Sequence, residues 1–272
     1  MKKIAKILVA VPFLLLSACI GVSIIATYPI PRGNKVSTEH YTYYKNFIGI
    51  YYISVKHSLA LFNHGTWGYL RDADQATFEV LDDCWAKDAT HVWHRDMAVY
   101  NVDVPSFHVN ASGLPIDKNH AYIIDYQDFT TIVHPSTSGI DAATAEYFVS
   151  RDSILQREWV RDKDFVYLED VRLEVDRATF RRLGGWMIDK DFVYGTTYNN
   201  DAKKWELCRI DSIQTPIKVM RSYLINGRNV IYGNKVIIQD VAVTDFEHTA
   251  PEECRINGTL YSFGKPKPQT RE

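Results

Sequence analysis

The stretch RDKDFVY at residues 161–167 returns almost unchanged as IDKDFVY at residues 188–194. In both copies an Asp is followed five residues later by a Tyr, with a polar turn sequence between them. Two earlier stretches keep this Asp-to-aromatic spacing. The complete series is Asp88 to Trp93, Asp117 to Tyr122, Asp162 to Tyr167 and Asp189 to Tyr194. Four occurrences of one spacing indicate a short structural unit that has been duplicated.

A second Asp lies upstream of each turn, in an Asp-x-x-Thr/Ser pattern. These residues are Asp74, Asp103, Asp141 and Asp176, and they precede the turn Asp by 14, 14, 21 and 13 residues. We expect each upstream Asp to open a turn or a single helical turn by accepting backbone N–H groups, as an N-cap residue does. A phenylalanine follows three of the patterns and is expected to point into the core (Phe78, Phe107 and Phe180).

The turn Asp is expected to close a β-hairpin, because Asp and Asn side chains accept backbone hydrogen bonds in tight turns. After the turn, the two-residue period of a strand places positions +3 and +5 on one face and position +4 on the other. The residue three before each turn Asp is also large and apolar (Trp85, Leu114, Trp159 and Trp186). Largely apolar strands of this kind are expected where hairpins stack between neighbours.

The spacing of the turns limits the fold. Successive turn Asp residues are 29, 45 and 27 residues apart, and a unit of that size cannot bury its apolar face alone. We therefore predict a mainly β fold, an open array of short β-hairpin repeats. A closed propeller-like ring is the alternative, although its usual four-stranded blades need more residues per repeat.

The predicted boundaries follow from composition. Residues 37–264 are expected to form a single repeat domain, with clear repeats over about 70–200 and a degenerate one over about 220–250. Residues 29–36 are expected to be a linker and residues 265–272 a tail. The segment 140–159 interrupts the repeat and is expected to be an inserted loop or a minor helix.

The phrase DKN or DKD, followed by His or Phe, a small apolar residue and Tyr, resembles the DKNYY family of bacterial repeat proteins. The resemblance covers about residues 70–200, with a weaker echo in NGRNVIY at 226–232. The first repeat departs from the pattern and has KDAT at residues 87–90. Because most members are secreted or lipoprotein-like, the resemblance implies a repeat architecture and a cell-envelope location. It implies no activity and no functional residues.

The N-terminus is typical of an export signal, with lysines within residues 2–6 before an apolar run over 7–16. The sequence LSAC at residues 16–19 resembles the bacterial lipobox, which implies cleavage before Cys19 and diacylation of that cysteine. However, the uncharged stretch continues to residue 28 and spans 22 residues, and about 20 suffice to cross a bilayer. An uncleaved helical anchor is therefore the alternative. Both place the body of the protein outside the cytoplasm, tethered to a membrane.

The charge balance argues against a nucleic-acid partner. Cleavage would remove three lysines and leave 28 Lys and Arg against 33 Asp and Glu, a net charge of -5. Nucleic-acid binding requires a basic face.

Three cysteines follow the export signal: Cys84, Cys208 and Cys254. In an oxidising compartment a disulfide between Cys208 and Cys254 is expected. The alternative is three small buried thiols, and Cys84, beside Trp85, is expected in the core.

Metal and cofactor motifs are weak. Asp162-Lys163-Asp164 has alternating oxygen ligands, but the sequence continues without the further ligands that calcium needs, and the central Lys opposes a cation. His91 and His94 are expected on a strand, where they point to opposite faces and cannot share a zinc ion. The sequence also has no nucleophile elbow, phosphate loop or dinucleotide fingerprint. The prediction is therefore structural turns and no cofactor.

Two groups of residues are expected at the surface. Adjacent acids are usual at solvated edges (Asp82-Asp83, Glu169-Asp170 and Glu252-Glu253). The N-terminal tyrosines lie outside the main repeats and are candidates for an exposed surface that binds sugar or protein (Tyr41, Tyr43, Tyr44, Tyr51 and Tyr52).

Together these observations predict a membrane-tethered envelope protein that acts as a binding or scaffolding module for an envelope protein or polysaccharide. The alternative is an envelope hydrolase whose site is assembled from residues distant in sequence. A deep pocket lined by two or three convergent ionisable groups would favour the hydrolase.

Overall fold

The computed structural model describes residues 41–45, 49–54, 66–127, 130–149 and 158–268. The chain divides into two compact units, one of residues 1–122 with 133–135 and the other of residues 123–132 with 136–272. The prediction of a mainly β fold is confirmed, since the described residues form many short antiparallel sheets and none of these closes into a barrel.

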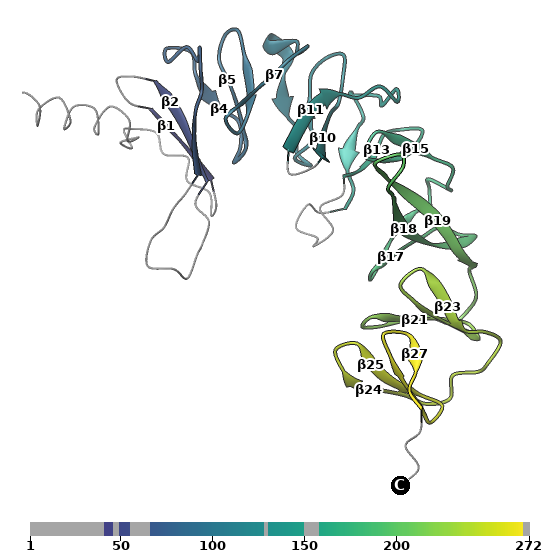
Figure 1. Cartoon of the computed structure of the whole chain (residues 1–272). Helices are drawn as coiled ribbons and strands as arrows, with labels where there is room; N and C mark the ends of the chain where they lie inside the picture. The colour runs from purple at the N-terminus through teal and green to yellow at the C-terminus, as the bar shows by residue number, and fades with distance from the viewer. Residues whose placement is uncertain (1–40, 46–48, 55–65, 128–129, 150–157, 269–272) are drawn as a thin grey trace, which may run out of the picture. The chain divides into compact units, whose positions relative to one another are not determined.

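The first unit has three sheets before residue 122 (Figure 1). Their strands are β1 (Tyr41–Lys45), β2 (Ile50–Ser54) and β3 (Thr66–Tyr69); β4 (Glu79–Val80), β5 (Trp85–Lys87), β6 (Val92–His94) and β7 (Met97–Val99); and β8 (His108–Val109) and β9 (Pro115–Ile116). The 3-10 helix η1 (Val104–Ser106) precedes β8. A further two-stranded sheet pairs β10 (Tyr122–Gln127) with β11 (Thr130–Pro135).

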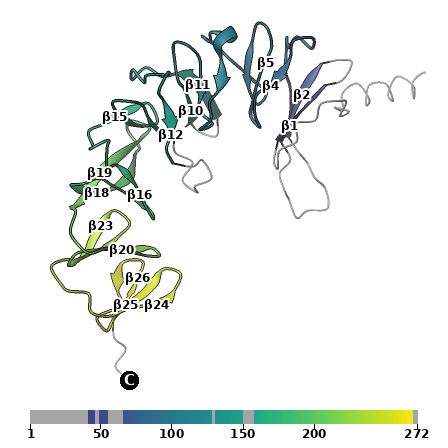
Figure 2. The same cartoon turned by 180° about the vertical axis from the view of Figure 1, so that it is seen from behind.

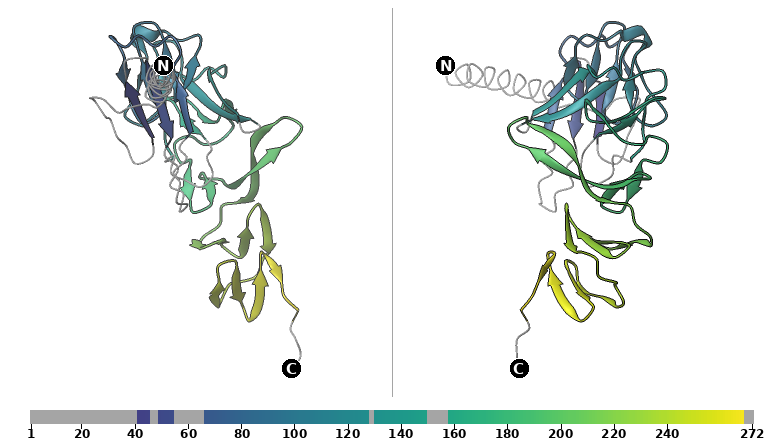
Figure 3. Two further views of the ribbon diagram at one scale, coloured as in Figure 1. Left: turned by 60° about the vertical axis from the view of Figure 1, so that its left-hand side comes forward. Right: turned by 90° about the vertical axis from the view of Figure 1, so that its right-hand side faces the viewer.

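The second unit contains four consecutive four-stranded meanders, visible from both sides in Figures 1 and 2. They comprise β12 (Glu146–Tyr147), β13 (Trp159–Arg161), β14 (Val166–Leu168) and β15 (Val171–Leu173); β16 (Arg181–Leu183), β17 (Trp186–Ile188), β18 (Phe192–Asn199) and β19 (Lys204–Ser212); β20 (Ile217–Met220), β21 (Tyr223–Asn226), β22 (Asn229–Tyr232) and β23 (Lys235–Ile238); and β24 (Phe246–Ala250), β25 (Glu253–Ile256), β26 (Thr259–Ser262) and β27 (Lys265–Pro266). The β18–β19 hairpin is longer than its neighbours and extends beyond them (Figure 3).

The repeating unit is a four-stranded meander, where the sequence predicted a two-stranded hairpin. Four strands fit because most are only two to five residues long, so that β4 to β7 occupy residues 79–99. The predicted hairpin is the central pair of each meander, for example β17 and β18, which pair Met187 with Tyr194. Strands this short allow a four-stranded unit within the repeat spacing of 27 to 29 residues.

Two predicted boundaries are corrected. Among the described residues of segment 140–159 there is no helix: Asp141 accepts the N–H of Ala143 and the hydroxyl of Thr144, and the chain then enters β12. This segment begins a regular repeat, and tertiary pairing overrides its helical propensity. The predicted tail begins too early, since β27 at Lys265–Pro266 pairs with β26 and completes the last sheet. Its proline is tolerated because the strand lies at an edge.

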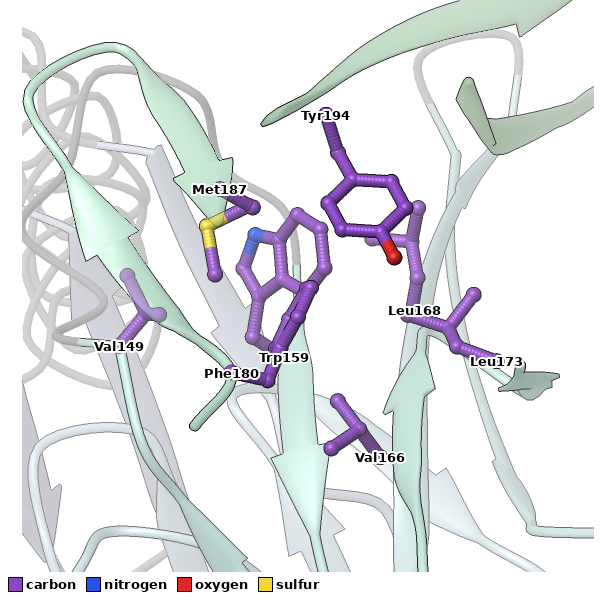
Figure 4. Close-up of a cluster of buried hydrophobic side chains, with 8 residues drawn as sticks. All are labelled: Val149, Trp159, Val166, Leu168, Leu173, Phe180, Met187 and Tyr194. Atoms are coloured by element: carbon purple, nitrogen blue, oxygen red, sulfur yellow. The ribbon is translucent and has the colours of Figure 1, made fainter. Parts of the chain in front are cut away.

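Aromatic side chains join successive repeats. Phe180 packs between Trp159 of the preceding sheet, at 6.0 Å between ring centroids, and Tyr194 of its own sheet, at 5.8 Å. Figure 4 shows these rings in one buried cluster with Val149, Val166, Leu168, Leu173 and Met187. In the first unit Phe107 occupies the same position between Trp85, at 5.4 Å, and Tyr122, at 5.5 Å. Each repeat therefore buries its apolar face against a neighbour, as the spacing predicted.

Three of the N-terminal tyrosines belong to the same system, so their predicted exposure was wrong. Tyr43, Tyr51 and Tyr52 are buried in the sheet of β1 to β3. Tyr43 contacts Phe78 at 5.7 Å, and Phe78 contacts Trp93 at 5.8 Å. Tyr43 thus holds the place that a tryptophan takes in later repeats.

Candidate functional site

The turn Asp is the centre of a hydrogen-bonded clasp. In the fourth copy, Asp189 Oδ1 accepts the backbone N–H groups of Asp191 and Phe192, both at 2.8 Å. Its Oδ2 accepts the N–H of the upstream Asp176 at 3.1 Å and the hydroxyl of Tyr194 at 2.6 Å. Four donors therefore converge on one buried carboxylate. The hydrogen bond from the Tyr hydroxyl explains why a Tyr follows the turn Asp at a spacing of five residues.

The other copies repeat this geometry. Oδ2 of Asp162 accepts Asp141 N–H at 3.0 Å and Tyr167 Oη at 2.9 Å, and Oδ2 of Asp117 accepts the corresponding groups of Asp103 and Tyr122 at 2.9 and 2.5 Å. Asp88 accepts Asp74 N–H at 2.7 Å. Its +5 residue is Trp93, which has no hydroxyl, and the Thr90 hydroxyl donates to the other carboxylate oxygen, Oδ1, at 3.0 Å.

The upstream Asp forms the second half of the clasp. Asp176 accepts the N–H and hydroxyl of Thr179, and the Thr179 oxygen accepts the N–H of Lys190 at 2.9 Å. The Lys190 ammonium then lies 3.1 Å from Asp176 Oδ2. The same ion pair joins Lys118 to Asp103 at 2.7 Å and Lys163 to Asp141 at 3.2 Å. The central lysine of the motif is therefore a partner of the upstream Asp.

The clasp favours the ionised carboxylate. Burial raises the pKa of Asp189, but hydrogen bonds from Tyr194 and from the N–H groups of Asp176, Asp191 and Phe192 outweigh it and hold that pKa below its ordinary value. Burial and the bond to Asp189 raise the pKa of the Tyr194 hydroxyl. The turn Asp oxygens thus act as acceptors for protein donors.

Two later repeats use Asn at the same place. Asn226 Oδ1 accepts Gln214 N–H at 2.8 Å, and its Nδ2 donates to Ser212 O at 2.8 Å. Asn257 likewise accepts Thr244 N–H at 2.9 Å and donates to Ala242 O at 2.8 Å. Only the first of these was predicted from the sequence, as a weak echo of the motif. Both repeats could have been recognised from the sequence, because Ile-Asn-Gly at 225–227 and 256–258 occupies the same position in the repeat as Ile-Asp-Lys at 188–190.

Two further carboxylates have structural partners. Asp170 was predicted at a solvated edge, but its oxygens accept the side-chain hydroxyls of Ser136, Thr137 and Ser138 at 2.5, 2.7 and 2.7 Å. The buried Glu158 accepts Tyr147 Oη at 2.8 Å and Ile124 N–H at 3.0 Å. Both carboxylates hold segments of the second unit together.

The two histidines lie as the sequence predicted, whereas the predicted disulfide does not form. His94 is buried and lies 4.8 Å from Trp85, whereas the His91 side chain is 43% exposed, as expected for a strand. Cys208 and Cys254 are free thiols, so the predicted disulfide is absent. Cys208 lies on β19 and Cys254 on β25, and the sheet of β20 to β23 packs against both of their sheets, which places them too far apart for a bond of about 2 Å.

A cleft lies between the last two sheets. Its volume is 510 Å³, and its walls come from β20, β21, the turn after β21 and the segment before β24. The apolar residues in its walls include Met220, Ile225, Val243 and Phe246. Three charged side chains also line it: Lys218, Arg228 and Asp245. Sequence reasoning missed this site, since the three charges are brought together only by the stacking of two repeats.

Comparison of the chain with protein-family models, curated proteins and solved structures gives no match. The resemblance to the DKNYY family thus stays a prediction from the motif. Cys19 and the rest of residues 1–40 lie outside the described residues. In the part of the chain that is described, no helix has the length and apolar character needed to span a membrane. That same part also contains no cluster of three or more His, Cys, Asp or Glu side chains arranged to hold a metal.

Proposed function

We propose that this protein is a membrane-tethered binding or scaffolding module of the cell envelope. The tether is the N-terminal segment, through a lipid on Cys19 or an uncleaved helix. The LSAC sequence at residues 16–19 and the resemblance to the DKNYY family support this placement.

The repeat structure supports a framework role. The carboxylates of Asp162 and Asp189 are engaged by four protein donors each, and Phe180 is buried between two sheets. These groups stabilise the array and are not available to a ligand. A rigid framework is suited to positioning a binding surface that is made by neighbouring repeats.

The observation that carries the proposal is the cleft between the sheets of β20 to β23 and β24 to β27. Its volume of 510 Å³ falls within the range of small-molecule and peptide sites, and it combines apolar walls with a few charged groups. Its ionisable residues, Lys218, Arg228 and Asp245, are the feature that favours the alternative, an envelope hydrolase. However, the lining has neither a histidine to activate the hydroxyl of Thr215 or Thr244 nor a second carboxylate to act together with Asp245, so binding is the better supported function.

The proposal is tested by cross-linked capture from the envelope of the source cell. The full-length tethered protein is compared with Ala242→Trp, which fills the cleft from an exposed wall position. Ala202→Trp is the matched control, because Ala202 is exposed in the β18–β19 turn. We expect a ligand that is captured by the wild type and by Ala202→Trp but lost with Ala242→Trp. Equal capture by all three proteins would contradict the assignment of binding to the cleft.

A further inference from the structure

The charges of the cleft identify a class of ligand. Lys218 on β20 and Asp245 before β24 form no ion pair with another described residue, although both line the cleft. Arg228 is held in place by the Asp240 carbonyl, which accepts from Nε at 3.2 Å and from Nη2 at 2.7 Å. The other terminal nitrogen of Arg228 remains for a ligand. The cleft thus contains two cationic side chains and one anionic side chain that can bind ligand groups of opposite charge.

The size of the cleft limits the length of a ligand that can contact these charges from within it. A volume of 510 Å³ corresponds to a space about 10 Å across. An extended chain covers at most about 3.3–3.6 Å per residue, so two or three residues span it. A ligand of that length with an anionic and a cationic end would match both kinds of charge in the cleft.

The walls between the charges favour apolar side chains. Met220 and Phe246 are partly buried, and a methionine adapts its shape to different apolar partners. Stacking on sugars usually uses an exposed aromatic face, whereas the aromatic residue of the lining, Phe246, is partly buried and contacts Tyr223 at 6.0 Å. A phosphate group would gain little from apolar walls. A short peptide matches both the charges and the walls.

We propose that this cleft binds a short peptide of two or three residues with both ends free. Its carboxylate lies at Lys218 and Arg228, its amino group lies toward Asp245, and its side chains contact Met220 and Phe246. The proposal rests on the binding function proposed above and names the ligand class of the same cleft.

Calorimetric titration of the full-length protein in detergent tests the proposal. The probes are Ala-Leu-Ala with free ends, the same peptide amidated at its C-terminus, and the same peptide acetylated at its N-terminus. We expect the free peptide to bind, and either cap to weaken binding about three- to tenfold, because each removes one charge-assisted contact. Absence of binding by the free peptide at millimolar concentration, or equal binding of all three, would overturn the proposal.

Matched variants assign each end of the peptide. In Lys218→Met, amidation should have less effect than in the wild type, and in Asp245→Asn, acetylation should have less effect. The controls are Lys235→Met and Asp201→Asn, exposed residues away from the cleft in which both caps should act as in the wild type. If capture from the envelope depends on Ala242 while no peptide binds, the ligand class is wrong and the binding function stands. If capture is also independent of Ala242, both proposals fail.

Discussion

The clasp at Asp189 makes a quantitative prediction about the substitution Asp189→Asn. An Asn has one acceptor oxygen, which can still accept the N–H groups of Asp191 and Phe192. Its amide nitrogen would then face the N–H of Asp176 and the hydroxyl of Tyr194, which lie 3.1 and 2.6 Å from the native Oδ2. The hydroxyl can rotate and accept from the amide, but the N–H of Asp176 cannot.

The expected loss follows from the groups left unpaired. Hydrogen bonds to a charged group contribute about 1.5–3 kcal/mol each, and a buried donor without a partner costs about 1–3 kcal/mol. One bond is lost outright and the others weaken, so Asp189→Asn should lower the free energy of unfolding by about 2–3 kcal/mol. Tyr194→Phe removes one donor and leaves three, so it should cost about 1–2 kcal/mol. The two substitutions share a bond, so the double variant should lose less than the sum of the single losses.

Urea unfolding followed by tryptophan fluorescence measures these losses. The matched control is Asp191→Asn, the same change two residues later at an exposed side chain in the same turn, which should cost less than about 0.5 kcal/mol. An Asp189→Asn variant as stable as Asp191→Asn would refute the account of the clasp. Strict additivity of Asp189→Asn and Tyr194→Phe would show that the Asp–Tyr bond is unimportant.

Four further predictions concern the core, pH, metal and anchor. Phe180→Ala should lower the free energy of unfolding by about 3–5 kcal/mol because it opens a cavity between Trp159 and Tyr194, whereas Tyr198→Ala, at a side chain 40% exposed, should cost much less; melting curves compare them. The pKa values of Asp88, Asp117, Asp162 and Asp189 are lowered in the fold, so their stabilisation is present above the unfolded value of about 3.9 and is lost as pH falls through the folded values; the melting temperature should fall in that range, and less steeply in Asp189→Asn. Millimolar calcium should leave the melting temperature unchanged, because the turn Asp oxygens bind protein donors; a rise of several degrees that Asp189→Asn abolishes would contradict this. The intact mass of the membrane-extracted protein should correspond to a chain that begins at a diacylated Cys19, and a mass that retains residues 1–18 without lipid would identify the uncleaved anchor.

The sequence predicted the parts of the fold that depend on local pattern. The residues three positions before the turn Asp, such as Trp85 and Trp159, are buried. The residues four positions after it, such as Val166 and Val193, are also buried, because alternation along a strand decides which face of the sheet a side chain joins. The N-cap role of the upstream Asp was also predictable, and Asp103 caps η1 as expected. Local pattern did not predict the four-stranded meander, because two-residue strands such as β4 and β12 carry no periodic signal.

The bonds between distant residues escaped prediction for a different reason. The Lys190–Asp176 pair and the Asp189–Asp176 bond join segments 13 to 14 residues apart, and their geometry depends on how the strands pair. From the sequence, a turn Asp needs only to accept turn N–H groups, and Asn should replace it at little cost. The two additional donors change that expectation. The cleft could not be predicted from local sequence pattern either, because Lys218 and Asp245 belong to different repeats.

The third clasp shows how the unit tolerates changes in length. Asp141 and Asp162 are separated by 21 residues, against 13 for Asp176 and Asp189, yet the two bonds measure 3.0 and 3.1 Å. Closing the longer loop costs only about 0.4 kcal/mol more, because the entropy of closure grows with the logarithm of length. Segments inserted between the two Asp residues of a clasp can therefore vary in evolution while the bonds that close the repeat stay the same. For protein engineers, this interval is the natural place to graft a foreign loop onto the array.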